Sequence, residues 1–317
     1  MIIWNLKVFS QNVCKNSLIT NTILETHSHF DILLIQELPW SEIRKIPNSS
    51  NCNGEPLMGT SHHPNWIAFA RYPSNNSDFP RVISYVNIHL NSLRFLLCRD
   101  IFDHRDINII SFTNNDICHY ILNIYSDSSH SALKYLKDTE VNINHVLLMT
   151  DDFNIRDSLW DPSFPFHSSI SNDLIMIADS FDLTLSSPIN PGPTRFSDTA
   201  GESNSVIDLM FLRCGSIELD RHTILSKSQL SSDHAPLVID IPICDKVIHS
   251  SKFVITPGSD QEKEFIKDVI SSLNSLDTSN IKSVDNLNWI VNQLGTIIKQ
   301  MWSKSAKRSR ISKHSKQ

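Results

Sequence analysis

Residues 145–160 read HVLLMTDDFNIRDSLW and join a buried strand to a cluster of polar side chains. Residues 146–149 are apolar without interruption, which favours a strand covered on both faces. Asp151, Asp152 and Asn154 follow at once. Because polar groups at the end of a buried strand lie at the rim of a sheet, this stretch predicts a functional site there.

Short apolar strands with a few helices between them account for most of the first 244 residues. We predict strands at residues 2–9, 31–36, 66–72, 81–90, 107–112, 118–125, 205–213, 217–225 and 235–241. We predict helices at 16–29, 129–137 and 170–181, the first capped by Asn16, and a turn-rich loop at 47–64. This pattern favours two sheets with outer helices over a Rossmann-type alternation.

The composition changes near residue 245. Residues 259–262 read SDQE, a capping box that opens a predicted helix to about residue 273, and helical spacing returns at 287–301. Residues 301–317 hold six lysines and arginines and no acid, although the whole chain has a net charge of −6. We therefore predict domains at 1–244 and 245–317. The basic tail suits nucleic-acid contact or a nuclear address, and also a solvated linker.

Several protein classes are disfavoured. No apolar run is long enough to cross a membrane, and residues 1–12 lack the regions of a signal peptide. The six cysteines are scattered and form no C-x-x-C pair. We read them as reduced thiols and expect an intracellular protein with no membrane partner.

Polar residues flank five of the predicted strands. Singly, each has a structural explanation, such as a turn, a cap or a solvated strand end. Together they supply a recognisable chemistry: Asn5 and Glu37 offer the oxygen ligands that Mg²⁺ prefers, and Asp152 and His234 are acid–base candidates. Asp208, inside an apolar strand, needs a partner and suits the role of orienting an imidazole.

Six short motifs occur in order along the chain: WN at 4–5, QE at 36–37, NIY at 123–125, DFN at 152–154, SVIDL at 205–209 and SDH at 232–234. In these motifs the chain resembles the endonuclease/exonuclease/phosphatase superfamily. It is most similar to the endonuclease domain of fungal non-LTR retrotransposon polyproteins, as are RDIFDHRDINIISF at 99–112 and the basic tail at 302–317. The resemblance implies a four-layer αββα sandwich of two mainly antiparallel sheets, followed here by a C-terminal helical appendage.

The resemblance also implies a role for each matched residue. The Mg²⁺ site, with Mn²⁺ as a substitute, takes Asn5 and Glu37, with Asp233 nearby. Further implied roles are contact with the scissile phosphate by Tyr125, orientation or activation of water by Asp152, holding of water or phosphate by Asn154, and charge stabilisation or proton uptake by His234 supported by Asp208. Thr194 and Ser232 match polar positions that support the site.

The implied activity is nicking of DNA, in the nucleus, to leave a 3′-hydroxyl that primes reverse transcription. In the related polyproteins a reverse transcriptase follows. This chain ends before one, so we expect a fragment or truncated copy. Two alternatives stay open: a phosphodiesterase acting on a small phosphoester such as an inositol phosphate, and a catalytically weakened or dead remnant.

Asp151 is the main departure from the family pattern, which has glycine at this position. Glycine permits backbone shapes that a side chain hinders, and a second carboxylate beside Asp152 would raise the pKa of one of the pair. We therefore hypothesise that Asp151 weakens activity, and that Asp151→Gly raises the nicking rate.

Overall fold

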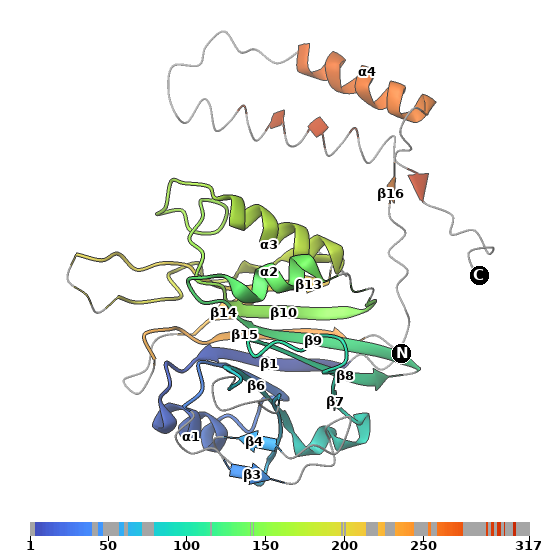
Figure 1. The fold of residues 1–317 in the computed structure, drawn as a ribbon. Coiled ribbons are helices and arrows are strands. Elements are labelled where there is room, and N and C mark those ends of the chain that lie inside the picture. The colour runs from blue at the N-terminus through green and yellow to red at the C-terminus, as the bar shows by residue number, and fades with distance from the viewer. Residues whose placement is uncertain are drawn as a thin grey trace. The chain divides into compact units, whose positions relative to one another are not determined.

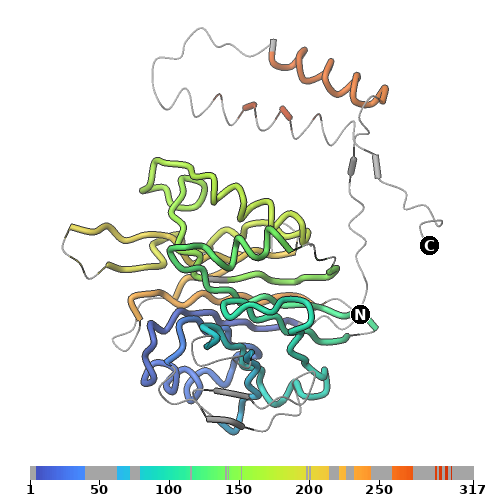
Figure 2. The backbone as a smooth tube through the Cα atoms, viewed as in Figure 1, coloured from blue at the N-terminus to red at the C-terminus, as the bar shows by residue number. Residues whose placement is uncertain are grey.

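The computed structural model describes residues 4–39, 44–46, 57–59, 63–71, 79–114, 116–139, 141, 143–197, 199, 201–213, 221–225, 232–243, 253–254, 259–274, 290, 293–294, 297–298, 301 and 307–308. Figure 2 traces the backbone, with all other residues in grey. The chain divides into two compact units, Met1–Val247 and Ile248–Gln317, and each is described by itself. The assignment of functional domains at 1–244 and 245–317 stays a prediction.

Two mixed sheets form the first unit (Figure 1). The first sheet has the order β12 (Ser187–Pro188), β14 (Arg221–Ile224), β15 (Leu237–Ile243), β1 (Trp4–Asn12), β2 (Ile32–Gln36), β6 (Val82–Asn87) and β5 (Trp66–Phe69). The second has the order β11 (Leu183–Leu185), β13 (Asp208–Arg213), β10 (Val146–Asp152), β9 (Ile117–Tyr125), β8 (Ile107–Asn114) and β7 (Leu96–Leu97).

The centres of the two sheets repeat one arrangement. β1 runs parallel to β2 and antiparallel to β15, and β10 runs parallel to β9 and antiparallel to β13. In each sheet the parallel pair ends where its antiparallel neighbour begins: Asp152 pairs with Asp208, and Ser10 pairs with Leu237. Each sheet thus brings two strand ends and one strand start to the same edge.

Helices cover the outer faces of the sandwich. α1 (Ser17–Thr26) packs its apolar side chains on the first sheet, and α2 (Ser131–Asp138) and α3 (Ser169–Ser180) pack theirs on the second (Figure 1). Asn16 caps α1 as predicted, since its side chain accepts hydrogen bonds from the amides of Leu18 and Ile19. The predicted four-layer sandwich is confirmed.

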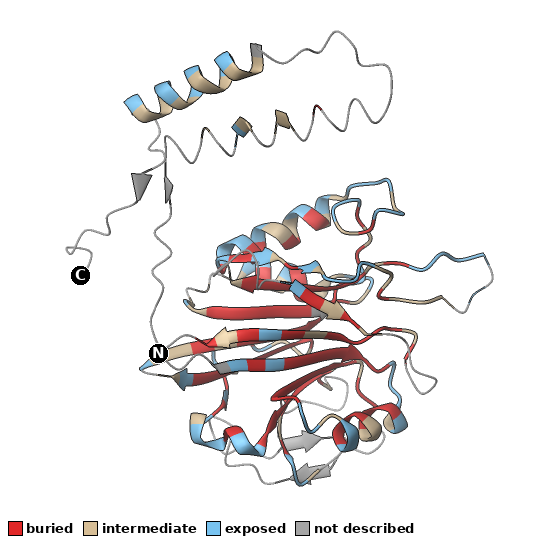
Figure 3. Cartoon of the chain, turned by 180° about the vertical axis from the view of Figure 1, so that it is seen from behind, coloured by how far each residue is buried: buried red, intermediate tan, exposed pale blue. Residues whose placement is uncertain are grey.

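Most strand residues are buried on both faces, as Figure 3 shows. Every residue of β2 and β6 is buried, because one face of the first sheet meets the second sheet and the other meets α1. This explains why residues 32–35 read as a continuous apolar run without alternation.

A line of polar side chains crosses the interface between the sheets, and we call it the polar seam. Gln36 Nε2 donates to Asn123 Oδ1 at 2.7 Å and to Ser10 Oγ at 3.0 Å. Asn123 Nδ2 donates to the carbonyl oxygen of Ile83 at 2.9 Å. Farther along, Ser84 Oγ donates to Asn108 Oδ1 at 2.6 Å, in another bond from the first sheet to the second. These hydrogen bonds satisfy amides that would otherwise be costly to bury.

Two predicted elements differ in detail. The expected loop at 47–64 contains β4 (Leu57–Gly59), which pairs with β3 (Arg44–Ile46) in a two-stranded ribbon. The predicted strand at 81–90 ends early because residues Ile88–Leu93 form a 3₁₀-helix, η2, with Asn87 as its N-cap.

The second unit contains α4 (Asp260–Asn274), in agreement with the capping box, and a ribbon of β16 (Phe253–Val254) and β17 (Lys307–Arg308). Most of the helix predicted at 287–301 lies outside the described residues. Among the described helices, none is long and apolar enough to cross a membrane.

Candidate active site

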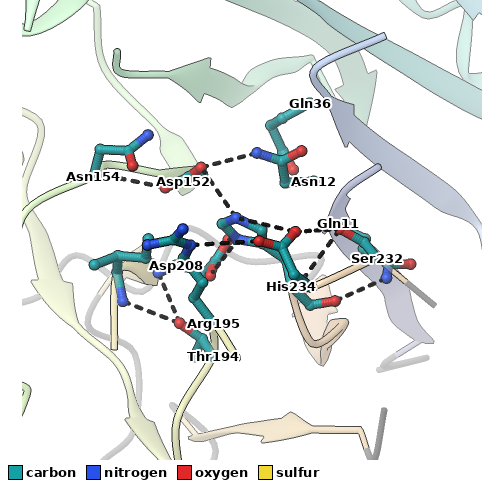
Figure 4. A network of polar contacts seen from close by, with 12 residues as sticks. Gln11, Asn12, Gln36, Asp152, Asn154, Thr194, Arg195, Asp208, Ser232 and His234 are labelled. Carbon is teal, nitrogen blue, oxygen red and sulfur yellow. Dashed lines mark hydrogen bonds and ion pairs between the residues drawn. The ribbon is translucent and has the colours of Figure 1, made fainter. Parts of the chain in front are cut away.

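The carboxyl ends of the two parallel pairs meet at one edge of the sandwich. Asn12 ends β1 and donates from Nδ2 to Asp152 Oδ2, at the end of β10, at 2.8 Å (Figure 4). Glu37 follows β2, and its Oε1 accepts a 2.5 Å hydrogen bond from the hydroxyl of Tyr125, which ends β9. Each contact joins a residue of one sheet to a residue of the other, so the site exists only when both sheets are packed.

The antiparallel neighbours contribute an aspartate and a histidine to this edge. Asp208 opens β13, and His234 precedes β15. The Nδ1 atom of His234 lies 2.9 Å from both carboxylate oxygens of Asp208. Because a carboxylate only accepts, Nδ1 carries the proton, and Nε2 is left facing Asp152 Oδ2 at 3.7 Å. Asp208 therefore holds the imidazole of His234 in one orientation, which is the contact predicted for this pair.

Buried polar contacts hold the Asp208–His234 pair in place. Thr194 Oγ1 accepts from the amides of Ile207 and Asp208, both at 3.0 Å, and its carbonyl accepts from Ala235 N at 2.7 Å. Thr194 is fully buried, so it joins the segments before β13 and β15 without water.

Two more contacts fix the backbone of His234. Its amide donates to Ser232 Oγ at 3.1 Å, and its carbonyl accepts from Gln11 Nε2 at 3.0 Å. Thr194 and Ser232 thus hold the backbone around Asp208 and His234, and their support of an active site stays a prediction.

Asn154 lies on the loop that leaves β10. Its amide donates to Asp152 Oδ1 at 3.1 Å, and its Nδ2 donates to the carbonyl oxygen of Ser126 at 2.8 Å. The residue is exposed and has a φ of 51°, which asparagine tolerates better than most residues. This turn places the Asn154 side chain in solvent beside the buried carboxylate.

Negative charge is in excess at the centre of the site. Asp152 and Asp208 are buried side by side, and Asp233 Oδ1 lies 4.0 Å from His234 Nε2. Burial, together with the charge of Asp208, raises the pKa of Asp152. Burial opposes the imidazolium of His234, but the carboxylates of Asp208, Asp152 and Asp233 outweigh it and raise the pKa of His234 to about 10. Three carboxylates thus surround one imidazolium, which favours binding of a further cation.

Neighbouring charges also affect the rim. Burial tends to raise the pKa of Asp233, but the Cys14 thiol, His234 and Arg195 together lower it. Arg195 Nε lies 3.4 Å from Asp233 Oδ2. Burial and then the hydrogen bond to Glu37 raise the pKa of Tyr125, which keeps the phenol protonated at neutral pH.

Asn5 does not belong to the site, and its predicted role as a metal ligand is corrected. It is exposed, pairs with Pro242 and lies seven residues before Asn12, or roughly 23 Å along an extended strand. Asn12 takes its place beside Asp152. The signal for Asn12 was available, because polar residues gather at the end of a buried strand, and Asn12 is the last residue of β1.

The donor set fits a hard divalent cation. Glu37, Asp152 and Asp233 carry carboxylate oxygens, and Asn12 carries an amide oxygen that accepts from Cys14 N at 2.8 Å. Among the described residues, Asp152, Asp208 and His234 also form one group whose ligand atoms all lie within 4.8 Å of one another. The excess of carboxylates supports binding of a cation at this edge.

Asp151 is an interior residue of β10, paired with Ile124 and Leu209. Extended backbone of this kind is open to any residue, so the strand position does not demand glycine. The effect of Asp151 on activity stays a prediction.

Residues 119–238 match the sequence model of a family described as endonuclease-reverse transcriptase. The resemblance to this family is confirmed. The matched segment of the endonuclease-reverse transcriptase family spans Tyr125, Asp152, Asn154, Asp208 and His234. No curated protein matches the chain.

Three solved structures illustrate the similarity of the chain trace. The endonuclease domain of TRAS1, a telomere-specific non-LTR retrotransposon, is 16% identical with a TM-score of 0.47, over 75% of this chain and 98% of that chain. An endonuclease/exonuclease/phosphatase family protein from Leptotrichia buccalis is 12% identical with a TM-score of 0.46, over 74% and 99%. A double mutant of beta toxin from Staphylococcus aureus, with bound magnesium ions, is 9% identical with a TM-score of 0.42, over 75% of this chain and 99% of that chain.

Proposed function

We propose that the chain is a metal-dependent phosphodiesterase, and more specifically an endonuclease that nicks DNA and leaves a 3′-hydroxyl. The observation that carries the proposal is the buried Asp152 carboxylate, which Asn12 holds and which faces the Nε2 atom of a histidine paired with Asp208. The family description of residues 119–238 supports the choice of a nucleic-acid substrate.

Asp152 orients the attacking water and takes its proton. Its Oδ1 and Oδ2 are fixed by Asn154 N and Asn12 Nδ2, so the carboxylate keeps one orientation. A raised pKa suits a group that must accept a proton near neutral pH. The exposed Asn154 amide lies where it can hold the water or a phosphate oxygen.

His234 stabilises the charge of the phosphate. With a pKa of about 10, its imidazole is protonated at neutral pH and is a poor base. A fixed positive group aimed at developing negative charge is among the strongest catalytic devices. Tyr125 is protonated, donates a hydrogen bond to Glu37 and contacts the scissile phosphate.

Glu37 and Asp233 would hold Mg²⁺, or Mn²⁺ in its place, with Asn12 taking the position first predicted for Asn5. When bound, such an ion supplies positive charge that offsets the charge of the reacting phosphate. DNA as partner, a reverse transcriptase in longer relatives and a nuclear location remain part of this proposal.

The test is nicking of supercoiled plasmid in Mg²⁺, with EDTA and Asp152→Asn as negative controls. We expect relaxed circles that a DNA polymerase extends without prior phosphatase treatment, because the product carries a 3′-hydroxyl. Folded protein that leaves plasmid intact would contradict the proposal. Turnover of an inositol phosphate by that protein would favour the small-substrate alternative, and no turnover of either substrate would favour an inactive remnant.

A further inference from the structure

Cys14 lies at the rim of the site, beside Asp233 and His234. Its Sγ donates to Asp233 Oδ1 at 2.7 Å and lies 3.1 Å from Ser232 Oγ. The thiol sulfur, a carboxylate oxygen of Asp233 and a ring nitrogen of His234 all lie within 4.8 Å of one another. Cys14 is exposed, so solvent ions reach this group.

The backbone holds the thiol in place before any ion arrives. Cys14 N donates to Asn12 Oδ1 at 2.8 Å, and the flanking amides of Val13 and Lys15 donate to the carbonyls of Gln36 and Glu37 at 3.0 and 2.7 Å. Cys14 and Lys15 have φ values of 49° and 58°, a conformation that costs free energy for such residues. The turn that carries Cys14 is thus tied to β2 on both sides.

His234 is oriented as metal-bound histidines are. Its Nδ1 proton goes to Asp208, and Nε2 lies 4.0 Å from Asp233 Oδ1. Metal-ligating histidines commonly donate their other ring nitrogen to a carboxylate, which fixes the ring and strengthens the ligand. Asp208 shares no hydrogen bond with Cys14 among the described residues, and it fixes the ring of His234 as a nitrogen ligand for the same site.

We propose that Cys14, Asp233 and His234 bind a borderline-soft divalent cation of the zinc type, and that its binding inhibits phosphodiester cleavage. Thiolate and imidazole select Zn²⁺ over Mg²⁺, and three protein ligands leave one tetrahedral position to water. The ion replaces the proton on Sγ and the proton on Nε2, and both pass to solvent. The inhibition rests on the proposed function, because a bound ion would keep His234 from the phosphate. Binding of the ion does not depend on the proposed function.

The binding is tested with Co²⁺, whose coordination by a thiolate produces a charge-transfer absorption band in the near ultraviolet. We expect the band in the wild-type chain, its loss on adding Zn²⁺, and no band in Cys14→Ser even at about 10-fold the Co²⁺ concentration that saturates the wild type, since loss of even an outer partner weakens binding at least 10-fold. Cys118→Ser, which changes another described free thiol, is the matched control and keeps the band. Circular dichroism checks that each variant is folded.

A band of equal strength in Cys14→Ser, or one abolished equally by Cys118→Ser, would overturn the site. Asp208→Asn adds a second check, because a loosened imidazole weakens Co²⁺ binding while the thiol remains. An Asp208→Asn protein that binds as tightly as the wild type would exclude His234 as a ligand.

The inhibition is tested by titrating Zn²⁺ into the plasmid assay, with each variant compared with its own rate in Mg²⁺ alone. We expect the half-inhibitory Zn²⁺ concentration to rise more than about 10-fold in Cys14→Ser and to stay unchanged in Cys118→Ser. Equal Zn²⁺ sensitivity in both variants would overturn the inhibitory role. A wild-type chain that never nicks plasmid would refute the proposed function alone, because the Co²⁺ band reports the site without turnover.

Discussion

Two clusters of buried and partly buried carboxylates lie close together in the first unit, and they differ in charge balance. In the first, Arg81 donates to both oxygens of Asp106 at 2.5 Å and to Asp127 at 2.8 Å, and a second guanidinium, that of Arg105, lies 3.7 Å from Asp106 Oδ2. In the second, Asp152 and Asp208 share the imidazole of His234. The guanidinium of Arg81 also lies over the ring of Tyr125, 4.7 Å from its centroid, so the clusters are neighbours.

The difference teaches how to separate a structural cluster from a functional one. Burial is shared, since Asp106 and Asp152 are both almost fully buried. In the Arg81 cluster the guanidinium groups of Arg81 and Arg105 match the carboxylates of Asp106 and Asp127. The pKa of Asp127 falls well below its usual range, because its burial is outweighed by Ser129 and Arg81. In the Asp152 cluster the carboxylates outnumber the cations and the pKa of Asp152 rises. Unbalanced charge, not burial, marks the site.

The largest expected effect is on catalysis. Asp152→Asn should lower the plasmid nicking rate by about 10³-fold, because general acid–base groups typically contribute 10²–10⁴-fold. Its free energy of unfolding should fall by no more than about 2 kcal/mol, because the loss of one acceptor for Asn12 or Asn154 is partly offset by the removal of a buried negative charge. A variant that loses activity only because it unfolds would contradict this assignment, and urea titration distinguishes the two.

The Arg81 cluster should respond in the opposite way. Asp106→Asn leaves the guanidinium short of a buried partner, so we expect the free energy of unfolding to fall by about 3 kcal/mol. Nicking per folded molecule should change far less than in Asp152→Asn. The measurement pairs urea unfolding with an activity assay at a temperature where both variants are folded. An unchanged urea midpoint would count against a structural role for this cluster.

The pH dependence of stability should sharpen the comparison. A raised pKa for His234 stabilises the folded state fully below pH 6.5, and this stability is lost as the pH rises through about 10. A lowered pKa for Asp127 acts at the other end, where stability is present above about pH 4 and is lost as the pH falls. In EDTA, the effect of His234 should be at most about 5 kcal/mol, since its pKa rises from 6.5 to about 10 and one pKa unit corresponds to about 1.4 kcal/mol.

Two variants assign these limbs in urea titrations from pH 2 to 10, a range set by the lowered and raised pKa values. His234→Gln should flatten the alkaline limb and leave the acid limb, and Asp127→Asn should do the reverse. A variant that alters both limbs equally would show that the clusters are not electrostatically separate.

The smallest effect compares the two ends of β1. Asn12→Ala should lower the nicking rate by about 10-fold, because Asp152 loses the donor that fixes its Oδ2. Asn5→Ala is the matched control on the same strand and should stay within about twofold, as expected of an exposed position. Equal losses in the two variants would return the metal site to Asn5.

Local patterns predicted the fold well. The apolar runs, the Asn16 cap and the polar residues after β10 all depend on neighbours in the sequence, where periodicity and capping are readable. The pairing of Asp208 with His234 was also predicted, because a carboxylate in an apolar strand requires a partner. Residues that follow a strand end were therefore found wherever the end itself was placed correctly.

Long-range partnerships were not predictable in the same way. Arg81 meets Asp106 and Asp127 across 25 and 46 residues, and no local pattern links them. Asn5 is chosen from the WN motif at residues 4–5, and the predicted strand ends at residue 9, three residues before the end of β1, which hides Asn12 and Cys14. A strand boundary shifted by a few residues changes which side chains reach the site, and only the register between strands removes that error.

The polar seam has a consequence for how the two halves of the site stay aligned. Apolar faces alone would let one sheet shift over the other at little cost in free energy. Gln36 and Asn123 oppose such a shift, because it would break their hydrogen bonds and leave buried amide groups without partners. Asn12 lies in the first sheet and His234 just before a strand of that sheet, whereas Asp152 lies in the second sheet. Residues outside the candidate active site therefore help to fix the relative position of its two halves.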